Sequence, residues 1–405
     1  MASTLLTLTD ITREAIRLWK NTNSFLKMID HQYDDSFAKE GAKIGTALRI
    51  RLPNDYVVRT GSAASPQDTA ESSSTLTVAT QKGVDIDFSS VDRTMSLDDY
   101  SSRVMEPMVN NLAGDVAATV MSGANGGISN FVSKVDGSSV IIAPDAETWL
   151  TAGAKLDGMS APKSNRYICV DRLTQARTVA SLTGLFNPSG KVSAQFNTGE
   201  MTSALGFDWM MDQTVLIHTT STWSGSKTVN GADQTGTTIT VNAVTGGFLI
   251  GDVITFAGVN AVNRITKEDT GELAQFVLTA TALTGATSLS IYPAIIPPDS
   301  GGNKVQYQTV TASPANSAAI VCVSPSAGTF RGNFAYHKDA VTIATADLEM
   351  PGGVWEAARE NFDGVAMRSV TAYQIGTDRT ITRLDVLFGY LWIRPEWACW
   401  VADAV

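Results

Sequence analysis

The segment that decides the fold begins with FAYHKDA at residues 334–340. It continues with MPGG at 350–353, RLDVLFGY at 383–390 and RPE at 394–396. The residues between these landmarks are rich in Val, Leu, Phe, Tyr and Trp, which favour buried strands. Because RPE interrupts the last apolar run, a buried sheet is a better interpretation than a contact with lipid. We therefore predict that a sheet closes the chain.

Working outward, residues 41–92 predict an extended loop built as a long β-hairpin. One run alternates apolar residues with Arg49 and Arg51, and a second alternates them with Asp85 and Asp87. Successive side chains of a strand point to opposite faces, so each run has one apolar and one charged face. Opposite charges across an antiparallel ladder stabilise the pairing by a few tenths to about 1 kcal/mol per pair. We predict that these two runs pair with each other.

Two other segments predict helices. Apolar residues at helical spacing indicate an N-terminal helical arm within residues 1–40. Residues 93–124 predict a long spine helix that begins at Ser96 and carries one continuous apolar stripe. Pro107 lies inside this helix and cannot donate a hydrogen bond to the carbonyl of Arg103. We therefore expect a bend at Pro107.

The remaining segments predict a mixed domain interrupted by an all-β module. Residues 125–221 alternate strand and helix signals, and residues 325–405 return to the same host. Residues 222–324 are rich in Thr, Val, Gly and Ser, and a segment of about a hundred residues has the size of a small independent domain. The strand candidates of this module are Thr237–Val241, Asp252–Phe256, Gln275–Thr279 and Ser288–Tyr292. The fold class that follows is α+β.

Composition limits the classes of function. The 405 residues carry a formal net charge of −10 and contain no basic run, which argues against nucleic-acid binding as a main activity. Charged residues are 17% of the chain, below the roughly 25% of a typical soluble protein. Cys169, Cys322 and Cys399 are scattered and odd in number, so we expect reduced thiols and no disulfide framework. No signal peptide or membrane-spanning run is expected.

Sequence signals for catalysis or cofactor binding are weak. His31, His218 and His337 have no Cys, Asp or Glu at metal-ligand spacing. The stretch 184–191 resembles a phosphate-binding loop only superficially, because its glycines are one residue too far apart and Val192 stands where Ser or Thr would bind magnesium. We therefore expect no catalytic, cofactor-binding or metal site, and no enzyme.

The C-terminal landmarks, in this order and spacing, resemble the coat proteins of short-tailed phages of the P22-like group, which share the Hong Kong 97-type capsid fold. A second stretch, GDVITFAGV at residues 251–259, resembles a turn and strand in the inserted immunoglobulin-like domain of that family. The resemblance implies a major capsid protein with an N-terminal arm, an extended loop, a spine helix, and peripheral and axial domains. It also implies an inserted domain on the outside of the shell.

For partners, the resemblance implies further copies of the chain, arranged as pentamers and hexamers of an icosahedral shell. It implies a scaffolding protein during assembly of a precursor shell, a portal protein, a possible decoration protein, and packaged double-stranded DNA that is enclosed without sequence-specific binding. Assembly would take place in the host cytoplasm, without a membrane. The alternative is a β-rich tail or surface adhesin, but an adhesin does not require the long amphipathic helix. A hydrolase is a more distant alternative, since no nucleophile has a neighbouring base.

Overall fold

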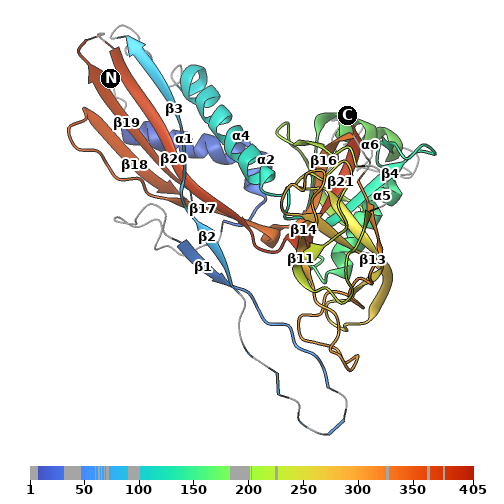
Figure 1. Cartoon of the computed structure of the whole chain (residues 1–405). Coiled ribbons are helices and arrows are strands. Elements are labelled where there is room, and N and C mark those ends of the chain that lie inside the picture. Colours follow the sequence, from blue (N-terminus) through green and yellow to red (C-terminus); the bar gives the residue numbers. More distant parts are fainter. Residues whose placement is uncertain are drawn as a thin grey trace. The chain divides into compact units, whose positions relative to one another are not determined.

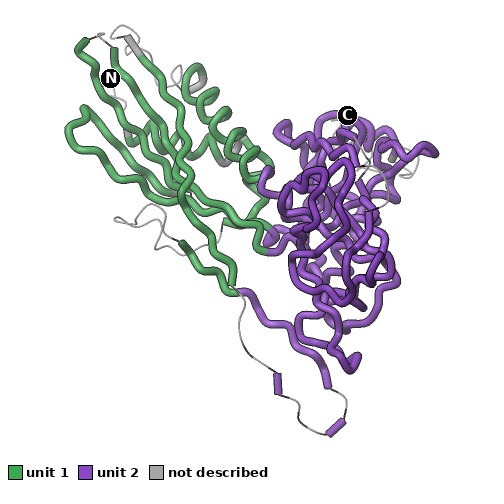
Figure 2. The backbone as a smooth tube through the Cα atoms, in the orientation of Figure 1, with its two compact units in different colours: residues 1–51, 73–120, 341–393 green, residues 52–72, 121–340, 394–405 purple. Residues whose placement is uncertain are grey.

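The computed structural model describes residues 8–31, 47–59, 61–62, 64, 66–67, 69, 73–89, 101–182, 201, 203–223, 227–324, 328–362, 365–376 and 379–405. It is a mixed α+β structure that divides into two compact units (Figure 2). Unit 1 contains residues 1–51, 73–120 and 341–393. Unit 2 contains residues 52–72, 121–340 and 394–405. Each unit is therefore assembled from segments that are far apart in the sequence.

A five-stranded antiparallel sheet forms the centre of unit 1 (Figure 1). Its longest strand, β20, contains the RLDVLFGY landmark and pairs on both edges. One edge pairs with β3, and the other pairs first with β19 and then with β17. Strand β18 pairs with the free edge of β19. The strands are β3 (Thr80–Ser89), β17 (Val341–Ala346), β18 (Glu356–Phe362), β19 (Val365–Gln374) and β20 (Arg379–Trp392).

The N-terminal helix α1 (Leu8–Thr22) packs against β18 and β19 of this sheet. Ala15, Ile16 and Trp19 form its buried face at spacings of one, three and four residues, as expected for an amphipathic helix. A short helix, α2 (Ser24–Lys27), follows it. The predicted helical character of the N-terminal arm is confirmed for these described residues.

The expected spine helix is described from Ser101 onwards, and it changes type along its length. A π-helical turn, η2 (Ser101–Met105), leads into the α-helix α4 (Glu106–Ser122). Pro107 is the second residue of α4, and it lies inside a helical stretch that is continuous from Ser101 to Ser122. The prediction that Pro107 lies inside the spine helix is confirmed for the described residues, although the helix changes from π to α type just before it. A bend at Pro107 stays a prediction.

Unit 1 also contains a small antiparallel sheet of β1 (Ala47–Arg51) and β2 (Ser73–Thr77). Leu76 and Val78 are buried in a cluster with Ala344 and Leu387 of the larger sheet. Gly389 of β20 permits this contact, because a Cβ there would lie 2.3 Å from the carbonyl oxygen of Thr77. The base of the extended loop is therefore packed onto the five-stranded sheet.

An eight-stranded mixed sheet organises the host part of unit 2 (Figure 1). Strand β21 lies between β4, to which it is parallel, and β16, to which it is antiparallel. The main order is β5-β4-β21-β16-β6-β8-β7, and β9 pairs with the far part of β16. The strands are β4 (Asn130–Val135), β5 (Ile141–Ile142), β6 (Arg166–Val170), β7 (Ser203–Ala204), β8 (Phe207–Met211), β9 (Ile217–Thr219), β16 (Thr329–His337) and β21 (Ala398–Ala404).

Helix α5 (Ala146–Gly158) packs against this sheet. Its start is defined by a capping box, in which Asp145 accepts a hydrogen bond from the N–H of Thr148 at 3.0 Å and Thr148 accepts one from the N–H of Asp145. Trp149 and Leu156 on its buried face join the hydrophobic core of the sheet. The other helical elements of unit 2 within the described residues are α6 (Arg172–Leu182) and the 3₁₀ turns η3 (Lys338–Ala340) and η4 (Pro395–Trp397).

A six-stranded antiparallel sheet occupies the segment between β9 and β16. Its core includes Phe248, Phe256 and Phe276, each at most 1% exposed. The chain enters and leaves side by side, because Thr219 pairs with Thr329 across β9 and β16. The order β10-β15-β12-β13-β14-β11 comprises β10 (Lys227–Thr228), β11 (Gly236–Thr240), β12 (Val253–Val262), β13 (Asp269–Leu278), β14 (Ser288–Ile295) and β15 (Ala319–Cys322). All four strand candidates of the sequence are observed here.

Candidate functional site

The two predicted arginines of the extended loop lie on β1, opposite β2. Arg49 is opposite Thr75, and Arg51 is opposite Ser73. Arg49 Nε donates a hydrogen bond to Ser73 Oγ at 2.7 Å. The prediction that this run pairs with the run of residues 84–88 is therefore wrong. The physical reason is that the backbone groups of β1 pair with β2, while β3, separated from β2 by two residues, extends along β20 and pairs with it.

The two predicted aspartates lie on β3 and face arginines that are almost three hundred residues away in the chain. Asp85 is opposite Arg383, with Arg383 Nε 3.5 Å from Asp85 Oδ1. Asp87 forms an ion pair with Arg379. All four side chains are about half exposed, and such pairs contribute about 0–1 kcal/mol. The alternating charges did indicate a cross-strand pairing, but with a different arginine-bearing strand.

The same ladder leads to a buried carboxylate, Asp385 of β20. Asp385 is fully buried, and its two oxygens accept hydrogen bonds from Arg368 at 2.6 Å and from Arg383 at 2.8 Å. The hydrogen bond and negative charge of Asp385 raise the pKa of Arg383. Gly83 of β3 leaves room for this group, since a Cβ there would lie 2.3 Å from Asp385 Oδ1. We call Gly83, Arg368, Arg383 and Asp385 the strand cluster.

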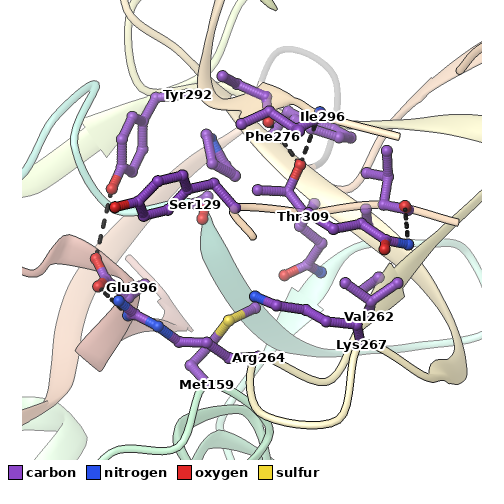
Figure 3. Close-up of a pocket in the computed structure, with 18 of the residues that line it drawn as sticks. Ser129, Met159, Val262, Arg264, Lys267, Phe276, Tyr292, Ile296, Thr309 and Glu396 are labelled. Atoms are coloured by element: carbon purple, nitrogen blue, oxygen red, sulfur yellow. Dashed lines mark hydrogen bonds and ion pairs between the residues drawn. The ribbon is translucent and has the colours of Figure 1, made fainter. Parts of the chain in front are cut away.

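A second polar cluster lies in unit 2, and we call it the joint (Figure 3). Arg264, from the turn between β12 and β13, donates from Nη1 to Glu396 Oε1 at 2.7 Å. Its Nε donates to Asp55 Oδ2 at 3.2 Å, and Lys267 Nζ lies 3.5 Å from the same oxygen. Tyr292 of β14 donates its hydroxyl to Glu396 Oε2 at 3.4 Å. The joint therefore connects three segments: the chain after β1, the six-stranded sheet, and the turn before β21.

Burial sets the electrostatics of the joint. Burial disfavours the charge of Arg264, but Glu396 and Asp55 more than compensate, so the pKa of Arg264 is raised. For Lys267 burial prevails over Asp55, and its pKa is lowered. Burial and the neighbouring Glu396 raise the pKa of Tyr292, which keeps the phenol protonated. The joint is thus a partly buried ion-pair network with a neutral phenol, an arrangement suited to holding segments together.

The stretch GDVITFAGV lies at the root of the six-stranded sheet. Gly251 has a φ of +91°, and a Cβ there would lie 2.8 Å from Cε1 of His218 in β9. Asp252 is fully buried, and its Oδ2 accepts hydrogen bonds from Ser221 Oγ and from the N–H of Leu249, both at 2.9 Å. The close approach of Gly251 to His218 and its positive φ require glycine at this position. The hydrogen bonds to Asp252 compensate for the burial of its carboxylate.

A further polar contact links the two sheets of unit 2. The side-chain amide of Gln275 in β13 accepts from the N–H of Phe131 at 2.8 Å and donates to its carbonyl at 3.0 Å. Gln275 and the joint residues Asp55, Arg264, Lys267 and Tyr292 were not predicted as site residues, because each is an isolated polar residue in a chain with few charges. Glu396 was noted only as part of the RPE landmark. Within the described residues, no group of three His, Cys, Asp or Glu is placed to hold a metal ion, and no helix is long and apolar enough to cross a membrane.

Comparison with known protein families decides the assignment. The family model described as "P22 coat protein - gene protein 5" matches residues 67–400. The chain belongs to the P22 coat protein family. It is a phage major capsid protein, and its copies form the icosahedral shell of the virion. This coat protein belongs to a family of structural capsid proteins, so the adhesin alternative is not favoured.

Several solved capsid structures are similar to the coat protein. A chain from Mycobacterium phage Che8 is 11% identical with a TM-score of 0.47, and the match covers 94% of this chain and 90% of that chain. The capsid of cyanophage P-SCSP1u is 11% identical with a TM-score of 0.44, covering 91% and 85%. The CUS-3 coat protein I-domain is 33% identical over 25% of this chain and 98% of that chain, with a TM-score of 0.20. No curated protein matches the sequence.

Proposed function

We propose that the coat protein has the Hong Kong 97-type fold and assembles as pentamers and hexamers around double-stranded DNA. The family match over residues 67–400 carries this proposal. The order of described elements supports it: a helical N-terminal segment, a loop whose base packs on a long sheet, a helix after the loop, and a mixed sheet that receives the C-terminus. The parts are the arm (1–40), the extended loop (41–92), the spine helix (93–124), the mixed domain (125–221), the inserted domain (222–324) and the return (325–405).

In this proposal the segment 222–324 is an inserted immunoglobulin-like domain that lies on the outside of the shell and helps to hold neighbouring capsomers. Its own core and the pairing of Thr219 with Thr329 support an insertion, because the host strands meet as if the module were absent. The joint supports a rigid connection, since Arg264 binds Glu396 of the host. In the proposal, an outer domain held in this way moves together with the host part of its own subunit.

The joint also holds the extended loop at Asn54 and Asp55, just after β1. Asp55 is held by Arg264 and Lys267, and the hydroxyl of Tyr307 donates to Asn54 at 3.1 Å. In the proposal the rest of the loop lies across an adjacent subunit. Each contact in a shell need only be modest, because every subunit is held by many neighbours at once.

Assembly would begin in the host cytoplasm as a precursor shell on a scaffolding protein, with a portal protein through which DNA enters and with a possible decoration protein added later. Electron microscopy tests this proposal directly. Full-length coat protein expressed with its scaffolding protein should form closed shells that contain fivefold and sixfold clusters. Solitary molecules under these conditions would refute the proposal.

Expansion of the precursor shell requires an element that pivots, and we propose the π-to-α change at Pro107. Pro107→Ala should leave subunit folding intact, because alanine is favourable within a helix, and should alter precursor assembly or the temperature of expansion. A surface substitution on the same helix, Glu106→Ala, is the matched control. Shells of Pro107→Ala that form and expand as the wild type does would show that this position is not the pivot.

A further inference from the structure

A cavity of about 360 Å³ adjoins the joint in unit 2 (Figure 3). Its lining is mainly apolar, with Met159 on the host side and Val262, Phe276, Pro293 and Ile296 on the side of the six-stranded sheet. The volume lies within the range of about 300–1,000 Å³ that is usual for ligand sites. Since a cavity of about 150 Å³ holds a benzene molecule, this one has room for roughly a dozen heavy atoms.

Two buried polar side chains in the cavity wall are incompletely satisfied. The Lys267 side chain is 2% exposed, and Asp55, 3.5 Å away, is the partner of its ammonium group among the described residues. An ammonium group has three donors, so a second acceptor can be accommodated. Gln308 is 6% exposed, and its Oε1 accepts no hydrogen bond within the described part of the chain. A buried polar atom without a partner costs free energy that a ligand can recover.

The formal charges at the cavity favour a neutral ligand. Arg264 and Lys267 carry two positive charges, and Asp55 and Glu396 carry two negative charges, so the wall is balanced. An added carboxylate would disturb this balance in a partly buried site, where an unpaired charge is costly. A hydroxyl or amide group adds no charge, and it both accepts and donates hydrogen bonds.

We propose that this cavity binds a neutral, amphipathic small molecule of roughly nine to twelve heavy atoms with an apolar body and one hydroxyl or amide group. The polar group accepts a hydrogen bond from Lys267, and Gln308 Oε1 is a second acceptor in the same wall. The apolar body lies between Met159 of the host and Phe276 of the six-stranded sheet. Such a molecule stabilises the connection between the two sheets of unit 2 by filling the space beside the joint.

Binding of 1-octanol and octanoate to full-length, unassembled coat protein tests the proposal. Ligand-detected NMR titration should show saturable binding of 1-octanol and a matching rise in the thermal unfolding midpoint. Octanoate has the same chain but carries a negative charge, so it should bind at least about tenfold more weakly. Binding of 1-octanol that does not saturate, or octanoate binding as tight as that of 1-octanol, would overturn the proposal without any variant.

Two variants, each with a matched control, test the site itself. Lys267→Met should weaken 1-octanol binding about tenfold or more, because a hydrogen bond to a charged donor is lost. Lys304→Met removes a lysine of the same module that does not line the cavity, and it should bind as the wild type does. Ala294→Leu fills the cavity and should abolish binding, whereas Ala319→Leu at an exposed position of β15 should not. Unchanged affinity in both Lys267→Met and Ala294→Leu would place the ligand elsewhere and refute the assignment.

Discussion

Replacing Asp385 by alanine tests whether the strand cluster holds the central sheet of unit 1. Asp385 is fully buried and accepts hydrogen bonds from Arg368 at 2.6 Å and Arg383 at 2.8 Å. Arg383 is half exposed and can turn to water, but the Arg368 side chain is only 14% exposed and would lose its anion. Removing one partner of a buried ion pair costs about 3–5 kcal/mol. We expect a loss of this size in the stability of β19 and β20.

The chain supplies a matched control on the neighbouring strand. Asp87→Ala makes the same chemical change on β3, where Asp87 is 49% exposed and its partner Arg379 is 60% exposed. Solvent screens such a pair, and its loss costs about 0–1 kcal/mol. The two substitutions differ mainly in burial, so their comparison isolates the effect of burial on the ion pair.

Amide hydrogen exchange of peptides from β19 and β20 measures the local effect in the full-length subunit, without assuming that both units unfold together. Because 1.4 kcal/mol corresponds to a factor of ten, Asp385→Ala should accelerate exchange by roughly a hundredfold to a few thousandfold. Asp87→Ala should accelerate it by less than about sixfold. Equal acceleration by the two variants would refute the reasoning, since burial would then make no difference.

Three further predictions concern single positions. In a urea titration, Gly83→Ala should lower the free energy of unfolding by about 1–3 kcal/mol, because its Cβ would overlap the buried carboxylate of Asp385. The control Gly376→Ala places its Cβ where no atom lies within 4 Å, and it should change the free energy of unfolding by less than about 0.5 kcal/mol. Burial opposes the charge of Asp145, but its hydrogen bonds prevail and lower its pKa from 3.8 to about 2, so the cap stabilises α5 fully above pH 4 and is lost as the pH falls to 2. The difference in thermal midpoint between the wild type and Asp145→Ala should therefore shrink between about pH 4 and pH 2. A difference that stays constant over this range would contradict the prediction. Arg264→Glu should destabilise the six-stranded sheet by about 2–3 kcal/mol, measured as lost protection from amide hydrogen exchange. Adding Glu396→Arg to this variant should restore more than half of that protection. No restoration would mean that the Arg264–Glu396 pair at 2.7 Å does not stabilise the joint.

Local signals in the sequence were sufficient for most elements. Helix α5 (Ala146–Gly158) lies in the segment 125–221 that was expected to alternate strands and helices, and its apolar spacing and the cap at Asp145 both act within a few residues. Each strand candidate of the module was bounded by glycine-containing turns, and each is observed, although β12 continues to Val262. The type of helix around Pro107 could not be predicted from the sequence. The missing N–H of Pro107 was evident, but the π-helical turn before it depends on packing that no short window reveals.

The sequence by itself determined the periodicity of the elements, the likeness of the C-terminal landmarks to a coat protein, and the presence of paired charges on the loop. Only the tertiary structure decided which charges meet. Asp87 pairs with Arg379 and not with an arginine of the same loop, and Asp55 meets Arg264 and Glu396. The physical reason is that an exposed ion pair is worth at most about 1 kcal/mol with any arginine, whereas packing of the half-buried apolar face of β3 beside the buried residues of β20 selects the register.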